Sequence, residues 1–187
     1  MASDIKKRMI AGAARLLSRR GLQASSFAEI LQLTGAPRGS VYHHFPGGKD
    51  QLVAAAIQLA SDHLASALAH KVGSAEEIVD HFLNLWRSIL KRSDCEAGCA
   101  ILAVTVATDS PALLEEAGTI FRTWRARLSD LLVQGGLSPK RAKQFATTLI
   151  AAVEGGVVLS RAERSIEPFD AVARQLRDQL RTMVAKE

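Results

Sequence analysis

Residues 25–49 constrain the fold more than any other part of this sequence, because they predict two short helices joined by a tight turn. Ser26 and Glu29 have the spacing of a capping box, in which each side chain satisfies a backbone N–H at a helix start. Gly35 tolerates the left-handed conformation that often ends a helix. Pro37 cannot continue that helix but suits the start of the next one. The segment therefore predicts helix, turn and helix.

The second of these helices, about Arg38 to Phe45, is too short to be stable alone, so we expect Val41 and Phe45 to hold it by packing. Its outward face would be small and polar, with one aromatic ring. That face consists of Arg38, Gly39, Ser40, Tyr42, His43 and His44. Glycine and serine allow a close approach of the backbone, and the other side chains can donate to phosphates or base edges. The pattern is typical of a helix that enters a DNA groove.

The positive charge of the chain lies in the same region. The net charge is +5, and residues 1–50 hold eight basic and three acidic side chains, so the remaining 137 residues carry 16 of each sign. A basic patch is the electrostatic footprint of polyanion binding. The alternative is a solvated face of an amphipathic helix. Because the patch coincides with the helix-turn-helix pattern, we favour DNA.

Helical signals continue along the rest of the chain, and no stretch shows the alternation of a strand. The pattern predicts a first helix over about 4–20, a long one over 49–72 and another over 75–92, which begins at a second capping box of Ser74 and Glu77. Serine or glutamate followed by proline predicts three later starts, near residues 111, 139 and 168. With 48% hydrophobic residues the chain can bury a substantial core. We predict an all-α fold of about nine helices.

From Gly21 to Leu52 the sequence resembles the DNA-binding domain of the TetR (tetracycline-repressor-like) family of transcriptional regulators. The resemblance rests on Ser25-Ser26, Ile30, Thr34-Gly35, Arg38 through Phe45 and Lys49 through Leu52. The run from Gly35 to Ser40, the run from Pro46 to Asp50 and the segment Glu154-Gly155-Gly156 are closest to the LmrA- and YxaF-like branch.

The resemblance implies two domains: a three-helix helix-turn-helix DNA-binding domain at residues 1–48, and a helical ligand-binding and dimerisation bundle at 49–187. It implies a ligand-responsive regulator, expected to be a repressor, that binds a palindromic operator in double-stranded DNA as a homodimer and is released by a small-molecule inducer. The dimer would form through the last two long helices. From the sequence we expect the stripe of Phe145, Leu149, Ala152, Val153, Gly156, Val157 and Ser160 to let two helices approach closely.

For the DNA contacts we expect two groups. Ser25, Ser26, Tyr42 and Lys49 would touch the phosphate backbone, and Arg38, Gly39, Ser40 and His43 would approach bases, with Pro37 and His44 completing the interface. Base preference does not follow from the residues alone, because phosphate and base roles can exchange.

For the inducer pocket we look for aromatic and apolar side chains that share helix faces in the C-terminal part of the chain. The candidates are Phe82, Trp86, Phe121, Trp124 and Leu128, with Thr148 and Glu154 as polar contacts. The alternative for each aromatic residue is a place in the core. Trp86 and Trp124 rank highest, because each carries an N–H that needs a partner when buried.

The two cysteines, Cys95 and Cys99, would share a helical face if their segment is helical. Burial as small hydrophobic residues is the ordinary interpretation. A thiol sensor is the alternative, and it would give a DNA-binding regulator controlled by oxidation rather than by a small ligand. A closed metal site normally needs four ligands, and this segment does not supply them. We therefore predict no metal and no cofactor.

Two other function classes are weaker. For an enzyme, His43-His44 or the cysteines with His81 could be imagined as a cluster, but no nucleophile elbow, zinc-binding helix motif or phosphate-binding glycine loop is present. A nonspecific architectural DNA binder would differ in showing no sequence preference. The sequence has no signal-peptide pattern and no apolar run of the length that spans a membrane, so we expect a cytoplasmic protein with no membrane partner.

Overall fold

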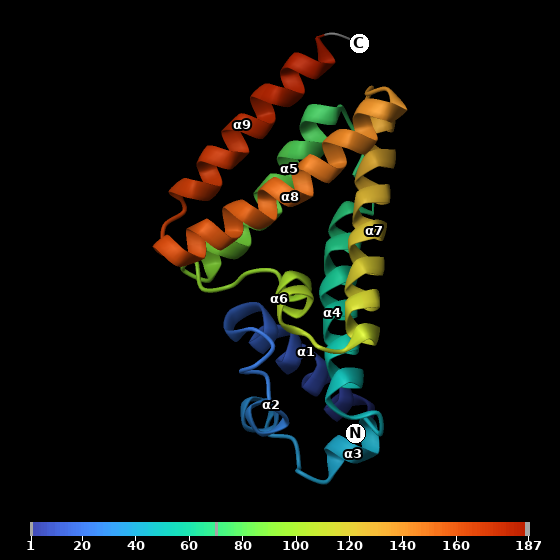
Figure 1. Cartoon of the computed structure of the whole chain (residues 1–187), viewed down its shortest axis with the longest axis vertical. Coiled ribbons are helices and arrows are strands. Elements are labelled where there is room, and N and C mark those ends of the chain that lie inside the picture. The colour runs from blue at the N-terminus through green and yellow to red at the C-terminus, as the bar shows by residue number, and fades with distance from the viewer. Residues whose placement is uncertain (1, 70, 186–187) are drawn as a thin grey trace. The chain divides into compact units, whose positions relative to one another are not determined.

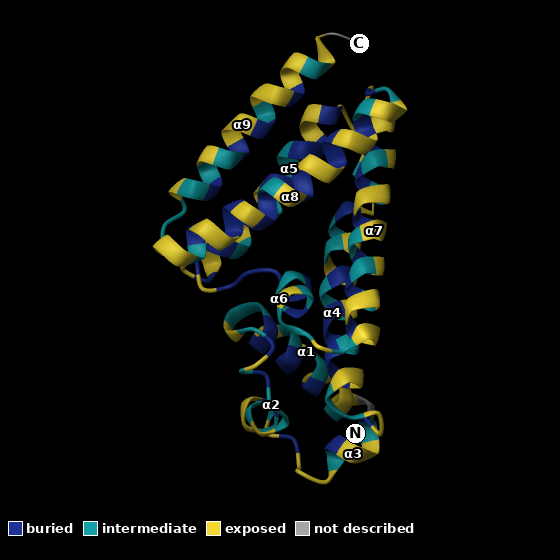
Figure 2. Ribbon diagram, viewed as in Figure 1, coloured by how far each residue is buried: buried dark blue, intermediate teal, exposed yellow. Residues whose placement is uncertain are grey.

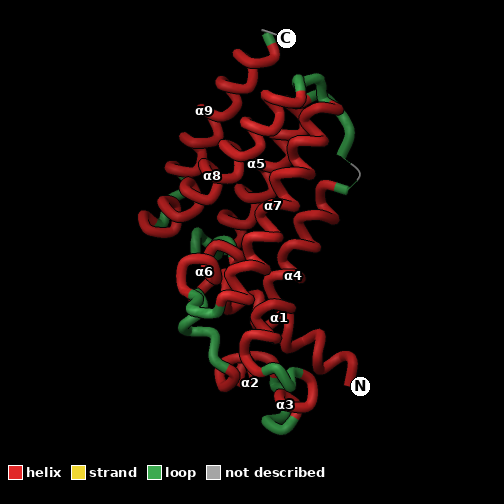
Figure 3. The backbone as a smooth tube through the Cα atoms, turned by 45° about the vertical axis from the view of Figure 1, so that its right-hand side comes forward, coloured by secondary structure: helices red, strands yellow, loops and turns green. Residues whose placement is uncertain are grey.

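The structure is a computed structural model that describes residues 2–69 and 71–185. Those residues form nine α-helices and no strand, so the all-α prediction is confirmed. Figure 3 shows the course of the backbone through these helices and the loops between them. In chain order the helices are α1 (Ala2–Arg20), α2 (Phe27–Thr34), α3 (Ser40–His44), α4 (Gly48–Leu68), α5 (Ala75–Arg92), α6 (Ala100–Ala107), α7 (Pro111–Gln134), α8 (Pro139–Glu163) and α9 (Glu167–Val184) (Figure 1).

Most of the helix starts are those that local sequence rules predict. The Ser74 hydroxyl accepts from the backbone N–H of Glu77, and the Glu77 carboxylate accepts from the backbone N–H of Ser74, so the second capping box is complete. The helices α7 and α8 begin at Pro111 and Pro139. Because a proline lacks the N–H that a helix leaves unpaired at its first turn, these positions tolerate it at no cost.

The chain divides into two compact units, and neither is continuous in sequence. The first unit contains residues 1–64 and 99–120, which include α1 to α3, most of α4, α6 and the start of α7. The second unit contains residues 65–98 and 121–187. The first turns of α4 bury Leu52, Val53 and Ile57, which gives them a place in the core of the first unit. The boundary at residue 48 between a DNA-binding and a ligand-binding domain stays a prediction.

The core of the first unit is built on α1, which packs against α2 and α6. Every helix from α1 to α4 contributes fully or almost fully buried side chains. They include Met9, Leu16, Leu17, Ile30, Val41, Phe45, Leu52, Val53 and Ile57. Gly21 ends α1 with a φ of 78°, in the left-handed region that glycine adopts without strain.

The second unit is organised around the pair α8 and α9, which a short turn at residues 164–166 connects (Figure 1). The helix α5 packs against both. The two helices pack closely at Gly156, where an added Cβ atom would lie 3.5 Å from the Cα atom of Phe169, at ordinary van der Waals distance. Phe145 on α8 and Phe169 on α9 are fully buried.

By length and composition, α8 could cross a membrane, with a mean hydropathy of 1.3 over its most apolar 18 residues. Half of that window is buried inside the structure. The core helix of a globular protein passes the same test, so the apolar character of α8 is explained by its packing against α5 and α9.

Candidate nucleic-acid interface and regulatory unit

The helix α2 is fixed at both ends by the contacts that its sequence predicts. At its start, the Glu29 carboxylate accepts from the backbone N–H of Ser26 at 3.1 Å, and Glu29 N donates to the Ser26 hydroxyl at 3.2 Å. The hydrogen bonds that the carboxylate accepts from the backbone N–H and the hydroxyl of Ser26 lower the pKa of Glu29, with smaller contributions from Arg20 and Lys49. At its end Gly35 adopts the left-handed conformation, with a φ of 63°. The α2 prediction is confirmed.

The helix α3 is shorter than predicted. It begins at Ser40 rather than near Arg38, because Pro37 to Gly39 form a turn in which the Pro37 carbonyl accepts from both the backbone N–H and the hydroxyl of Ser40. Val41 and Phe45 are buried, with 2% and 0% of their surfaces exposed, so the expected anchors are confirmed.

The residues expected to read DNA lie on the surface of the first unit, at and around α3. Pro37, Arg38, Gly39 and His43 are exposed, and Ser40 and His44 are half-buried. Tyr42 is 74% exposed, and its ring lies 6.4 Å from the ring of Phe27 on α2. The structure therefore brings one aromatic, one guanidinium and two imidazole side chains to a single surface.

Three of the residues that we expected to contact the phosphate backbone of DNA have hydrogen-bond partners within the protein. Ser25 is fully buried, its hydroxyl donates to the Gly21 carbonyl at 2.8 Å, and its N–H donates to Leu22. These bonds occupy both of its donors, so we leave Ser25 out of the interface. The half-buried Ser26 is engaged in the cap of α2. The Lys49 ammonium donates to the Leu22 carbonyl at 3.1 Å and so ties the start of α4 to the loop after α1.

In the second unit, four of the five aromatic and apolar candidates for ligand contacts are buried. Phe82, Trp86, Trp124 and Leu128 are between 0% and 6% exposed, and Phe121 is half-buried. The rings of Phe121 and Trp124 meet edge to face, with centroids 5.6 Å apart. Trp86 differs from the others because no described residue accepts a hydrogen bond from its buried Nε1. A buried donor without a partner is rare and costly.

The two polar candidates lie in different surroundings on α8. Glu154 is buried, with 8% of its surface exposed. Thr148 is exposed, and its hydroxyl donates to the Gln144 carbonyl one turn earlier. Thr148 therefore points away from the buried aromatic residues of its own subunit.

The stripe that we expected on the dimer surface faces inward instead. Phe145, Leu149, Val153, Gly156, Val157 and Ser160 are buried, and only Ala152 is half-buried. The reason is that α8 uses this stripe to pack against α9 and α5 within the subunit. The exposed face of α8, visible in Figure 2, carries a different set, namely Thr147, Thr148, Ala151, Gly155, Val158 and Leu159. We call this set the outer α8 face.

The cysteines do not share a helical face, because residues 95–99 lie in the loop between α5 and α6. Cys95 has a φ of 57° and is buried, and burial raises the pKa of its thiol, with a further contribution from Asp94. Since the thiolate is the reactive form, Cys95 is poorly suited to sensing oxidants. Cys99 is also buried, and its sulfur accepts from the N–H of Leu102 at the start of α6.

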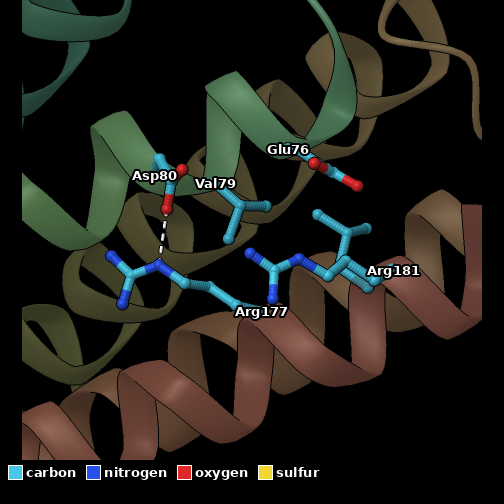
Figure 4. Close-up of a pocket in the computed structure, with 6 residues that line it drawn as sticks. Glu76, Val79, Asp80, Arg177 and Arg181 are labelled. Carbon is cyan, nitrogen blue, oxygen red and sulfur yellow. Dashed lines mark hydrogen bonds and ion pairs between the residues drawn. The ribbon is translucent and has the colours of Figure 1, made fainter.

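Charged side chains join α5 to α9 on the surface of the second unit. The Arg87 guanidinium donates to both oxygens of Asp170, at 2.7 and 2.8 Å, and this pairing lowers the pKa of the Asp170 carboxyl. A second ion pair, between Arg177 and Asp80, lines a small pocket with Glu76, Val79, Leu180 and Arg181 (Figure 4). None of our ligand candidates lines this pocket. Within the described part of the chain, no cluster of His, Cys, Asp and Glu has a metal-binding arrangement.

Comparison with known families agrees with this geometry. Residues 9–56 match the family model described as bacterial regulatory proteins, tetR family, and residues 75–175 match the one described as transcriptional regulator LmrA/YxaF-like, C-terminal domain. The protein belongs to the TetR family. It is a DNA-binding transcriptional regulator of the LmrA/YxaF-like branch, and the family is one of regulators rather than enzymes.

Individual TetR relatives cover nearly the whole chain. An uncharacterized HTH-type transcriptional regulator of Mycobacterium tuberculosis is 34% identical over 182 residues, which are 94% of this chain and 93% of that one. The HTH-type transcriptional regulator LmrA of Bacillus subtilis is 27% identical, over 89% and 91% of the two chains. Among solved structures, a TetR-family regulator from Agrobacterium tumefaciens shares the fold, with a TM-score of 0.84 at 20% identity over 96% and 98% of the chains.

Proposed function

We propose that this regulator is a repressor that binds a palindromic operator as a homodimer and leaves it when a small molecule occupies the second unit. The observation that carries the DNA part is the surface around α3. Arg38, Tyr42 and His43 are exposed there, while Val41 and Phe45 anchor the helix from below. Gly39 has no side chain and that of Ser40 is short, so the backbone here is open to a groove.

We assign the contacts as follows. Arg38, Gly39, Ser40 and His43 approach base edges, and Tyr42 contacts the phosphate backbone. Phe27 supports this role of Tyr42, since its ring contact holds an otherwise exposed side chain in place. Pro37 and His44 flank the contact, and Ser26 and Lys49 adjoin it through the start of α2 and the start of α4.

We propose that the outer α8 face forms the core of the dimer interface, together with α9. It exposes Val158 and Leu159 at 50% each, which is a large apolar area for a surface helix. Apart from its chain neighbours and the backbone of its own helix, nothing lies within 4 Å of the position that a Cβ on Gly155 would occupy, so there is room for a partner helix to approach closely there. A two-fold axis would place two copies of α3 about one DNA turn, ~34 Å, apart and so match a palindrome.

We propose an inducer site around Trp86, which has a buried indole N–H without a described acceptor. A ligand with a hydrogen-bond acceptor would satisfy that donor, and Phe82, Phe121, Trp124 and Leu128 would supply apolar contact area. Glu154 would be a polar partner, and Thr148, being exposed, would take part only through the dimer surface. The ligand would favour a state of the dimer in which the two copies of α3 no longer match both half-sites of the operator. A preference of ~100-fold for that state shifts the equilibrium by ~2.7 kcal/mol.

Selection of bound fragments from random duplex DNA tests the proposal. The expected product is an inverted repeat. The selection repeated with a library of apolar and cationic drug-like molecules should identify compounds that abolish binding to this repeat. A selected sequence without two-fold symmetry would contradict the palindrome. Compounds that bind the second unit but never change DNA affinity would contradict ligand control.

Thiol control makes a different prediction. If oxidation rather than a ligand released the DNA, replacing Cys95 and Cys99 by serine would abolish release by hydrogen peroxide. We expect an unchanged response, because the buried Cys95 thiol has a raised pKa. The cytoplasmic location stays a prediction that fractionation of cells would test.

A further inference from the structure

The first turns of α1 place a cation beside the end of α3. Lys6 is exposed, and its ammonium group lies 5.8 Å from the centroid of the Phe45 ring, the residue that directly follows α3. At this distance the negative face of an aromatic ring attracts a cation. Phe45 therefore holds the Lys6 charge near the helix that we assign to the DNA groove.

Two further contacts fix the position of this part of α1. The Ser40 hydroxyl lies 3.8 Å from the sulfur of Met9, which is fully buried. The Arg8 guanidinium donates to the carbonyl of Thr34 at the end of α2. Packing on both sides, against α2 and against α3, therefore determines where Lys6 lies relative to the DNA-reading surface.

The chemistry of Lys6 suits a phosphate. Among the described residues no carboxylate forms an ion pair with it, so its charge is not neutralised within the subunit. An ammonium on a flexible stem is a compact charge that binds phosphate without a fixed geometry. A helix that lies in the major groove, about 12 Å wide, has a phosphate backbone on each side. A cation close to the end of that helix lies within reach of this backbone.

We propose that Lys6 is a phosphate contact on α1, outside the helix-turn-helix, that adds affinity without sequence preference. The inference rests on the DNA-binding activity of the family and requires neither a palindrome nor an inducer. A random-sequence duplex is therefore a sufficient probe.

The decisive measurement is the salt dependence of binding to this duplex. Lys6→Met removes the charge but keeps an unbranched apolar side chain over Phe45. We expect the slope of log K against log salt to decrease by about 0.9 for each DNA-bound protomer. At 0.1 M salt the same relation gives an affinity loss of about eight-fold per protomer. Lys6→Arg should retain the slope of the natural protein.

Arg15→Met is the matched control, because it removes the same charge from an exposed position on the same helix. Nine residues separate the two positions, so Arg15 lies on the opposite side of α1 and about 13 Å along it. We expect its slope to match that of the natural protein. Lys6→Met with an unchanged slope, or an equal decrease in both variants, would overturn the proposal. If the natural protein bound no duplex, the DNA-binding assignment itself would fail.

Discussion

The contact between α1 and α2 predicts how a substitution at Gly12 changes the free energy of unfolding, and one distance sets the size of that change. Gly12 lies on the buried face of α1, and a Cβ atom added there would be 2.5 Å from Cγ2 of Thr34 on α2. Carbon atoms normally pack at about 3.5–4.0 Å. Gly12→Ala would therefore force the helices apart by about 1 Å or rotate Thr34 from its place.

Both movements are costly because Thr34 is held at two points. Its hydroxyl donates to the Ile30 carbonyl at 2.7 Å, which opposes rotation of the side chain, and its backbone carbonyl accepts from Arg8 on α1, which opposes separation of the helices. Overpacking of this kind typically costs about 1–3 kcal/mol. Replacing glycine by alanine inside a helix recovers about 1 kcal/mol. We expect a net decrease of about 0–2 kcal/mol in the free energy of unfolding.

Thr34→Ser separates the two effects, because it removes the clashing methyl group and keeps the hydroxyl. In that background Gly12→Ala should raise the free energy of unfolding by up to about 1 kcal/mol. The coupling energy in the double-mutant cycle should be about 1–3 kcal/mol. Urea denaturation followed by circular dichroism measures it, at one protein concentration because dimerisation would add to stability. If Gly12→Ala had the same effect in both backgrounds within about 0.5 kcal/mol, the steric argument would be wrong.

Three other predictions test the assigned surfaces. Arg38→Ala should cost about 1–3 kcal/mol of binding to the selected operator and relax preference at one base pair, whereas an equal loss on every duplex would mark a phosphate contact. Gly155→Arg should convert the dimer to a monomer in sedimentation analysis with helix content unchanged, and a stable dimer would exclude the outer α8 face as the interface. Asp170→Asn should lower the free energy of unfolding at neutral pH by about 1–2 kcal/mol, a value reduced because the ion pair is partly exposed. Because the pKa of this carboxyl is lowered in the folded state, its contribution to the free energy of unfolding is present above the unfolded-state pKa and is lost as the pH falls through the folded-state pKa. The free energies of unfolding of the two proteins should therefore converge in acid. A difference that stayed constant with pH would refute the assignment.

Local signals in the sequence predicted most helix starts, because capping is decided within four residues. The pairs Ser26 with Glu29 and Ser74 with Glu77 both form the expected reciprocal bonds. The helix α6 gave no such signal. Its sequence, Ala100 to Ala107, is apolar on all sides and rich in β-branched residues, so it has no periodicity that would indicate which face is buried.

The direction of a helix face was harder to predict than its existence. On α8 both sides carry small and apolar residues, and the sequence does not say which side meets α9 and which a second subunit. We chose the side that includes Gly156, and the structure buries it within the subunit. In the same way, the i, i+4 spacing of Cys95 and Cys99 suggested a shared face, but Cys95 and its neighbour Asp94 adopt left-handed backbone conformations that end the helix.

The discontinuity of the first unit has a consequence for biosynthesis. The helix α1 packs against α6, and the intervening residues 65–98 belong to the other unit. During translation about eighty further residues are therefore synthesised after α1 before α6 emerges from the ribosome and can pack against it. A nascent chain interrupted after Leu64 would hold an incomplete first unit whose apolar surface is exposed to solvent. Such a surface is a natural substrate for chaperones and proteases.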